Sequence, residues 1–359
     1  MSQSVSIAEL MKTSGVSFGT SGARGTVAAM TDRTCWCYTT AFIEMLRRRG
    51  QAPQAMAIAG DLRPSTGRIL AATAHALRSA GVAVRHCGRI PSPAVALYGM
   101  EHGLPTLMVT GSHIPDDRNG IKFTTAQGEI TKEDEQAIRE EWVDVPEATF
   151  GEDGMLLEPE SMPEVEDAAA REYVARYLRW FGKESLRGLR VGLYEHSSVG
   201  RDLAAEVLRG LGAEVVGLGR SEVFLPVDTE AIRPEDVKAA AEWAKEGPFD
   251  ALVSMDGDAD RPLLSDAQGV WLRGDVLGIL VSRILGVRRL AIPVSCNTAA
   301  DKCGSFDRVQ RTRIGSPFVI AAMQQLAAEA GGAVAGYEAN GGYLLQSPVL
   351  REGRELSAL

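Results

Sequence analysis

One segment of the chain reads Phe249-Asp-Ala-Leu-Val-Ser-Met-Asp-Gly-Asp-Ala-Asp-Arg261, an apolar run followed by aspartates at alternate positions. A short apolar run is typical of a buried strand in a parallel sheet, so the aspartates are expected on the loop at its carboxyl end. Neighbouring carboxylates repel one another unless a cation lies among them, and Mg²⁺ is a natural partner for such oxygen ligands. An EF-hand is excluded, because Arg261 and Ala267 stand where its loop requires Gly and Glu. The segment predicts a magnesium site made by Asp256, Asp258 and Asp260, with the cation Arg261 beside it.

Strands and helices alternate along the rest of the chain. Predicted strands cover residues 55–59, 82–86, 106–110, 190–194, 214–218, 289–294 and 333–337. Predicted helices follow Pro64 and Pro91 and cover residues 199–211, 234–245, 275–285 and 317–330. Strands that alternate with helices form mostly parallel sheets covered on both faces. The pattern predicts an α/β fold of three successive similar domains with mixed, mostly parallel sheets around one cleft.

The last strand of each predicted repeat ends in a polar loop that contains glycine. The three loops begin at Gly111, Asp256 and Glu338. Because ligands of open α/β sheets bind outside the carboxyl ends of the strands, we expect these loops to share one cleft. The predicted boundaries are domain 1 over residues 1–150, a linker over 151–168, domain 2 over 169–268 and domain 3 over 269–359.

The composition fits a globular protein of two or three domains. Of its 359 residues, 45% are hydrophobic and 24% are charged. A net charge of −9 argues against nucleic acid or an anionic membrane as the main partner. The five cysteines show no zinc spacing and are expected to be free thiols. No apolar run reaches the length of a transmembrane helix, and no signal peptide is recognisable, so we expect a cytoplasmic protein.

A second polar loop lies in the segment Val109-Thr-Gly-Ser-His-Ile-Pro-Asp-Asp-Arg-Asn-Gly-Ile-Lys-Phe123. Ser112 follows a predicted strand, so its hydroxyl is expected to be exposed. His113 can carry a proton or donate to a phosphate, and Lys122 can return to the same place after a turn at Asn119-Gly120. No Gly-x-Ser-x-Gly elbow surrounds Ser112, so the serine alone is weak evidence for catalysis. The predicted magnesium site strengthens the evidence for catalysis, because a phosphoserine carries roughly −1.5 to −2 charge and needs a divalent ion beside it.

Four separated stretches together resemble the α-D-phosphohexomutases, the family of phosphomannomutases and phosphoglucomutases. Phe18-Gly-Thr-Ser-Gly-Ala-Arg-Gly25 resembles the N-terminal signature of that family. The Ser112 loop resembles its phosphoserine loop, usually Thr-Ala-Ser-His-Asn-Pro. The segment from Asp256 to Arg261 resembles its magnesium loop, and Gly336-Tyr-Glu-Ala-Asn-Gly-Gly342 resembles its sugar-recognition loop. The four stretches follow one another in the order and at the spacing found in the family, so the resemblance covers nearly the whole chain.

The resemblance implies a role for each matching residue. Ser112 would carry the transferable phosphate and would hold Mg²⁺ together with the three aspartates. The groups that line the phosphoryl path would be Arg24, His113, Lys122 and Arg261. Sugar hydroxyls would be read by Glu338 and Asn340. The turn that contains Arg313 and Gly315 precedes a predicted helix. Independently of the resemblance, this turn is expected either to bind a substrate phosphate or only to cap the helix. Asp61 and Arg63 are expected to form a structural ion pair.

The implied reaction interconverts hexose 6-phosphate and hexose 1-phosphate of mannose, glucose or both. It runs through the phosphoserine and a hexose 1,6-bisphosphate, which also serves as activator. Phosphoglucosamine mutases typically carry Gln at the position of Glu338, so glucosamine phosphate is the second choice of substrate. The residues also leave open a metal-dependent sugar phosphatase and a non-catalytic sugar-phosphate-binding fragment. We expect a monomer or weak dimer whose partners are small sugar phosphates.

The chain departs from the family pattern in several places. Gly111 replaces a common Ala, Ile114 replaces a common Asn, and Gly342 stands where many mutases carry a His. The loss of that ring would leave more proton transfer to His113 or Lys122. Members of the family usually continue into a fourth, smaller domain that binds the non-transferring phosphate. The sequence given stops at Leu359, so we expect that domain to be absent from it and to belong to a C-terminal part outside it.

Overall fold

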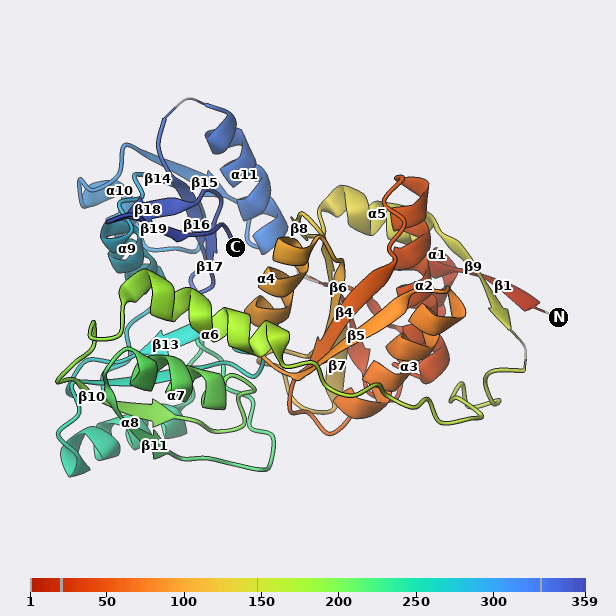
Figure 1. Cartoon of the computed structure of the whole chain (residues 1–359), viewed down its shortest axis with the longest axis horizontal. Coiled ribbons are helices and arrows are strands. Elements are labelled where there is room, and N and C mark those ends of the chain that lie inside the picture. Colours follow the sequence, from red (N-terminus) through yellow and green to blue (C-terminus); the bar gives the residue numbers. More distant parts are fainter. Residues whose placement is uncertain (1, 20–21, 147, 330) are drawn as a thin grey trace. The chain divides into compact units, whose positions relative to one another are not determined.

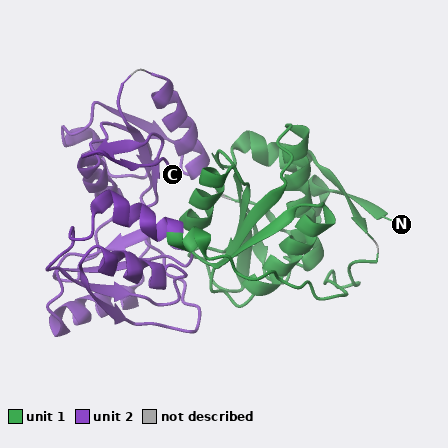
Figure 2. Cartoon of the chain, viewed as in Figure 1, with its two compact units in different colours: residues 1–171 green, residues 172–359 purple. Residues whose placement is uncertain are grey.

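The computed structural model describes residues 2–19, 22–146, 148–329 and 331–359. The chain divides into two compact units, residues 1–171 and residues 172–359 (Figure 2). Each unit has its own sheets and its own buried apolar clusters. The predicted α/β fold class is confirmed.

The first unit is built on a mixed seven-stranded sheet with the order β2-β3-β7-β6-β4-β5 and β8 beside β7. Its strands are β2 (Ser17–Phe18), β3 (Ala23–Thr26), β4 (Ala55–Gly60), β5 (Ala83–Arg89), β6 (Thr106–Val109), β7 (Arg118–Thr125) and β8 (Gly128–Glu129). Strand β4 is parallel to β5 and β6, whereas β7 is antiparallel to both of its main neighbours, β3 and β6.

Helices cover both faces of this sheet. They are α1 (Ile7–Ser14), α2 (Asp32–Arg48), α3 (Thr66–Ser79), α4 (Ser92–His102) and α5 (Lys132–Glu140). Figure 1 shows α4 on one side of the sheet and α2 and α3 on the other. A separate antiparallel ribbon pairs β1 (Ser2–Ser6) with β9 (Trp142–Pro146). Buried side chains of α2, α3 and the central strands form one large core, including Phe42, Ile58 and Phe123.

The second unit contains two four-stranded sheets, with the orders β11-β10-β12-β13 and β15-β14-β16-β17. The strands of the first sheet are β10 (Arg190–Tyr194), β11 (Glu214–Leu218), β12 (Ala251–Met255) and β13 (Pro262–Leu264). Those of the second sheet are β14 (Arg289–Pro293), β15 (Arg308–Thr312), β16 (Val334–Tyr337) and β17 (Tyr343–Leu345). A short hairpin joins β18 (Val349–Arg351) to β19 (Arg354–Leu356). The helices are α6 (Ala168–Phe181), which begins in the first unit, α7 (Arg201–Gly210), α8 (Pro234–Glu246), α9 (Gly274–Ile284), α10 (Ala299–Lys302) and α11 (Ser316–Ala328).

The same strand arrangement occurs three times. In each sheet the first strand of the repeat lies between the second and the third, which run parallel to it, and a fourth strand pairs antiparallel with the third. The three series are β4-β5-β6-β7, β10-β11-β12-β13 and β14-β15-β16-β17. The predicted similarity of three successive sheets is therefore present in the strand order, while the exact domain boundaries stay a prediction.

The parallel strands match their predicted positions closely, and β10 and β11 have the predicted bounds. Helix α11 begins one residue before the predicted start, and its predicted end at Ala330 lies outside the described residues. The predicted turn at Asn119-Gly120 is wrong, because both residues belong to β7. The buried Asn119 amide donates to the hydroxyls of Ser65 and Thr66, which holds this segment in the sheet. The turn lies earlier, at Asp116 and Asp117.

All five cysteines lie in the described part of the chain and are free, as predicted. Four of them are buried, and burial raises the pKa of the Cys35 and Cys37 thiols to about 12. Such thiols stay protonated at neutral pH and act as small apolar side chains. No helix among the described residues has the length and apolar character needed to cross a membrane.

Candidate active site

One loop in each repeat joins the third parallel strand to the antiparallel strand beside it. These are the serine loop (residues 110–117), the metal loop (residues 256–261) and the recognition loop (residues 338–342). Each loop starts at the carboxyl end of a parallel strand, where open α/β sheets bind ligands. The three polar segments selected from the sequence thus occupy the same place in the three repeats.

Two of these loops, the serine loop and the metal loop, contain a residue with a strained backbone. Among the described residues other than glycine, φ is positive at Ser112 (56°), His196 (28°), Ala259 (59°) and Glu352 (52°). Ser112 belongs to the serine loop and Ala259 to the metal loop. A left-handed conformation at such residues costs on the order of 1–3 kcal/mol and persists only where the surroundings enforce it. The strain makes both loops candidates for function.

Ser112 is fully buried, and its backbone is held from two sides. Its N–H donates to Thr110 Oγ1 at 2.7 Å, and its carbonyl accepts from the Arg63 guanidinium at 2.8 Å. The expectation of an exposed serine is therefore wrong, because these contacts draw the loop inward. The Ser112 hydroxyl lies 3.4 Å from Nδ1 of His113, so the predicted Ser-His neighbours are in contact. The predicted ion pair of Asp61 and Arg63 is present, with 3.0 Å between Oδ2 and Nε.

Arg24 and Lys122 lie on strands beside the serine loop. Arg24 in β3 pairs with Gly120 in β7, and Lys122 in β7 pairs with Met108 in β6. Paired residues share a face of the sheet, and so do residues two apart, which places Arg24 and Lys122 on the same face. A Cβ at Gly120 would lie only 2.8 Å from Cγ of Arg24, so glycine makes room for the Arg24 side chain. Two cations thus share one face of the sheet from which the serine loop extends.

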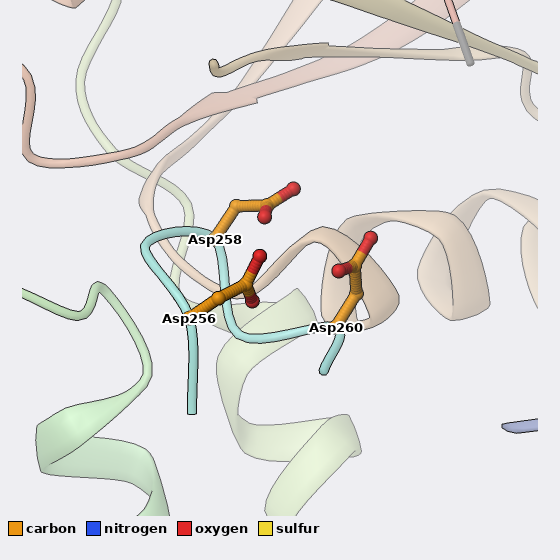
Figure 3. A group of neighbouring side chains, drawn as sticks. All are labelled: Asp256, Asp258 and Asp260. Carbon is orange, nitrogen blue, oxygen red and sulfur yellow. The ribbon is translucent and has the colours of Figure 1, made fainter. Parts of the chain in front are cut away.

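The metal loop brings its three aspartates together (Figure 3). One oxygen from each of Asp256, Asp258 and Asp260 lies within 4.8 Å of the others, and the first two side chains are fully buried. Figure 3 shows all three carboxylates on the same side of the loop. Because like charges at this spacing repel strongly in a buried site, the arrangement fits a divalent cation with oxygen ligands.

Arg261 lies beside the aspartates, and its backbone N–H donates to Oδ1 of Asp256 at 3.3 Å. Its Nε is 4.0 Å from Asp256 and 3.8 Å from Asp260, longer than a direct hydrogen bond. Burial acts to lower the pKa of Arg261, but Asp260, Asp256 and Asp258 raise it more, so the net shift is upward. Glu338 contributes to the same rise. Within the second unit, the carboxylate of the recognition loop is therefore close enough to the metal loop to act on its arginine.

A segment after β10 supports the metal loop from behind. Ser198 Oγ donates to the carbonyl of Asp256 at 2.7 Å, and the Val199 N–H donates to the carbonyl of Gly257 at 3.0 Å. The buried His196 ring bonds through Nε2 to the carbonyl of Met255 at 2.7 Å. Burial lowers the pKa of His196 to about 4, so the ring is neutral and Nε2 is the donor to that carbonyl. No pattern in the sequence points to this role of His196.

The recognition loop is closed by its own hydrogen bonds. The Glu338 N–H donates to the carbonyl of Gly342 at 3.0 Å, and the Gly342 N–H donates to Oδ1 of Asn340 at 2.9 Å. Thr229, from the loop between β11 and α8, donates to the carbonyl of Asn340 at 2.5 Å. A Cβ at Gly341 would lie 2.8 Å from the carbonyl oxygen of Pro262, directly after the metal loop. The metal and recognition loops are thus held next to each other within this unit.

The remaining predicted residues are placed less tightly. Gly315 caps α11 with a φ of 122°, a conformation that favours glycine. The Arg313 guanidinium lies over the ring of Phe318, 5.7 Å from its centre. In the N-terminal signature, Thr20 and Ser21 lie outside the described residues. Roles in substrate binding for Arg313 and Gly315 stay predictions.

Several residues that shape the loops carry no strong sequence signal. Thr229 and Ser198 are ordinary polar residues that precede helices, and nothing in their spacing distinguishes them. Asp61 and Thr110 offered more, because both directly follow neighbouring parallel strands, β4 and β6, whose ends share one edge of the sheet. The order of these two strands is enough by itself to place Asp61 beside the serine loop.

Comparison with known families extends these observations. Residues 15–147 match the family described as phosphoglucomutase/phosphomannomutase, alpha/beta/alpha domain I. Residues 171–269 match its alpha/beta/alpha domain II. The first match contains the serine loop, and the second contains the metal loop.

Curated and solved proteins point the same way. A phosphomannomutase of Salmonella muenchen is 44% identical over 98% of this chain and 71% of its own length. One of Sinorhizobium fredii is 47% identical over 96% of this chain and 72% of its own length. The structure of a phosphoglucomutase/phosphomannomutase family protein from Burkholderia thailandensis has a TM-score of 0.72 at 21% identity, covers 91% of this chain and is itself covered to 72%, which shows a shared fold. With its strand order, its aspartate loop and these relatives, the chain belongs to the phosphoglucomutase/phosphomannomutase family, the α-D-phosphohexomutases.

Proposed function

We propose that the protein is a phosphohexomutase, an isomerase that interconverts hexose 6-phosphate and hexose 1-phosphate with mannose phosphates as its main substrates. The observation that carries the proposal is the aspartate triad, because three carboxylates within 4.8 Å suit an enzyme that handles phosphate with a divalent ion. The relatives at 44% and 47% identity are phosphomannomutases. Phosphoglucosamine mutases among the relatives are only 29–32% identical, which makes glucosamine phosphate the weaker choice.

In this proposal Ser112 carries the phosphoryl group. The bond between phosphorus and Ser112 Oγ breaks while a bond to a free hydroxyl of the hexose monophosphate forms, and the hydroxyl proton is passed to a basic group. The product is a hexose 1,6-bisphosphate. Return of its other phosphoryl group to Ser112 leaves the isomerised monophosphate. Added bisphosphate would therefore activate the enzyme by loading Ser112.

The surrounding residues would bind and orient the reacting groups. Arg24, Lys122 and Arg261 would neutralise charge on the moving phosphoryl group, and His113, in contact with Ser112, would hold or pass the proton. Asp256, Asp258 and Asp260 would hold Mg²⁺, with an oxygen of phosphorylated Ser112 as a further ligand. When bound, this ion would supply positive charge against the phosphoryl oxygens.

The substrate would be recognised by the sugar and by its other phosphate. Glu338 can accept hydrogen bonds from two adjacent sugar hydroxyls, and Asn340 lies in the same closed loop. Arg313 and the start of α11 at Gly315 would receive the non-transferring phosphate, because a helix N-terminus favours an anion. We also propose that the protein acts in the cytoplasm as a monomer or weak dimer.

A Ser112→Ala variant tests the assignment. We expect it to lose mutase turnover of mannose 1-phosphate while its circular dichroism spectrum stays that of the wild type. Near-normal turnover in Ser112→Ala would rule out a phosphoserine at this position. Release of inorganic phosphate without isomerised sugar by the wild-type protein would instead support a phosphatase.

A further inference from the structure

Asp61 and Arg63 lie directly beneath the serine loop, and their contacts go well beyond an ion pair. We propose that they are positioning residues that fix the backbone of Ser112 for phosphoryl transfer. The proposal rests on the function given above, but it concerns residues outside the four motifs that carry the family likeness.

Every N–H group of the Arg63 guanidinium donates a hydrogen bond to the serine loop, to Arg118 directly after it, or to Asp61. Its side chain has no exposed surface, and Nε donates to Asp61. The two terminal nitrogens donate to four carbonyl oxygens within seven residues, those of Ser112 (2.8 Å), Ile114 (2.5 Å), Pro115 (2.6 Å) and Arg118 (3.0 Å). All five N–H donors of the group are therefore used. Because one buried guanidinium binds four carbonyl oxygens of this segment, it fixes the path of the loop backbone.

Asp61 holds the other side of the same loop. Its carboxylate accepts from the Thr66 and Thr110 hydroxyls, each at 2.7 Å. Thr110 Oγ1 in turn accepts the N–H of Ser112 at 2.7 Å. Burial raises the pKa of Asp61, while Arg63 and the two hydroxyls act against this rise. The N–H and the carbonyl of Ser112 are thus both connected to the Asp61–Arg63 pair.

Gly111 fits the same arrangement. A Cβ at this position would lie 2.5 Å from Cζ of Arg63, which is too close for any real contact. The guanidinium cannot swing away easily, because each of its donors is bound. Glycine where the family commonly has alanine thus lets Arg63 lie flat against the loop in this chain.

This attachment has a consequence for catalysis. Ser112 has a φ of 56°, which a residue with a side chain adopts only when its neighbours enforce it. Both of its peptide groups are tied to the buried pair, so the direction of its side chain depends on the pair. Phosphoryl transfer relies on alignment, and a misplacement of about 1 Å can cost roughly 100-fold in rate.

The test compares Arg63→Lys and Thr110→Val with the wild type, using Thr110→Ser as the conservative rescue. Lysine cannot reproduce the five-donor fork, and valine removes only the hydroxyl that links Ser112 to Asp61. Arg289→Lys is the matched control, because Arg289 is also buried and donates to two carbonyls and a carboxylate, but in β14. The readouts are phosphoryl uptake by Ser112 from glucose 1,6-bisphosphate, KM for mannose 1-phosphate, and deuterium exchange of residues 110–120.

We expect Arg63→Lys and Thr110→Val to slow phosphoryl uptake by roughly 10- to 100-fold at unchanged KM and to raise exchange in the loop. Thr110→Ser should restore the rate, and Arg289→Lys should change neither quantity. Wild-type uptake and exchange in folded Arg63→Lys or Thr110→Val, or an equal loss in Arg289→Lys, would overturn the proposal. If Arg63→Lys does not fold, Thr110→Val and its serine rescue decide the question. A wild-type protein that takes up no phosphoryl group would refute the proposed function, while the exchange data would still decide whether the pair fixes the loop.

Discussion

The metal loop gathers three carboxylates and one guanidinium within six residues. Asp256 and Asp258 are fully buried, Asp260 is partly exposed, and Arg261 stays 3.8–4.0 Å from two of them. Three carboxylate oxygens within 4.8 Å of one another repel, and they offer the oxygen ligands that a divalent ion prefers.

Loss of one carboxylate should therefore weaken metal binding. We expect Asp258→Asn to lower Mg²⁺ affinity by roughly 100-fold, because the site loses both a ligand and a negative charge. Calorimetric titration gives the affinity, and thermal melts with and without Mg²⁺ give the stabilisation, which should nearly vanish in the variant.

Glu246→Gln is the matched control for that variant. It removes one negative charge from the exposed end of α8, in the same unit. Equal Mg²⁺ affinity in Asp258→Asn and Glu246→Gln would show that the triad is not the metal site.

At the scale of elements, the loops are fixed by strands and segments far away in sequence. The recognition loop receives a hydrogen bond from Thr229, which precedes α8, and the metal loop receives one from Ser198, which precedes α7. The position of each loop thus depends on a hydrogen bond from a distant segment as well as on the two strands that the loop joins.

A Thr229→Val variant tests this support for the recognition loop. The substitution leaves the buried carbonyl of Asn340 without its 2.5 Å donor. A lost hydrogen bond of about 1 kcal/mol corresponds to a rise in KM for the sugar phosphate of roughly fivefold. Steady-state kinetics should show this rise with unchanged Mg²⁺ affinity, and Thr229→Ser should restore the wild-type KM. An unchanged KM in Thr229→Val would mean that the loop keeps its shape without the contact.

Sequence patterns predicted the parallel strands well, because strands such as β10 and β12 are mostly apolar runs between clear turns. The antiparallel fourth strands were not predicted. Strand β13 has only three residues, and the start of β7 was interpreted as a turn at Asn119-Gly120. The three aspartates were predicted to be neighbours from their spacing. Contacts such as Thr229 with Asn340 join residues 111 positions apart, and no local pattern encodes them.

At the scale of the whole molecule, the two units have separate cores. Ile58 in β4 belongs to the core of the first unit, and Leu290 in β14 belongs to a core of the second. Both side chains are fully buried, so Ile58→Ala and Leu290→Ala should each cost about 2–5 kcal/mol.

Differential scanning calorimetry measures how these losses are distributed. We expect more than one transition, with each variant lowering the melting temperature of the transition of its own unit. A single transition lowered equally by both variants would show instead that the units unfold together.

The measurement that bears most directly on the account is the intact mass of the protein before and after mixing with glucose 1,6-bisphosphate and Mg²⁺. Ser112 is itself buried and has a strained backbone, and we predict that the wild-type protein gains one phosphoryl group, mapped to Ser112 by peptide analysis. Ser112→Ala should gain none, and mannose 1-phosphate should remove the group from the wild type. No gain in the wild type, or an equal gain in Ser112→Ala, would contradict a mutase that works through a phosphoserine at this position.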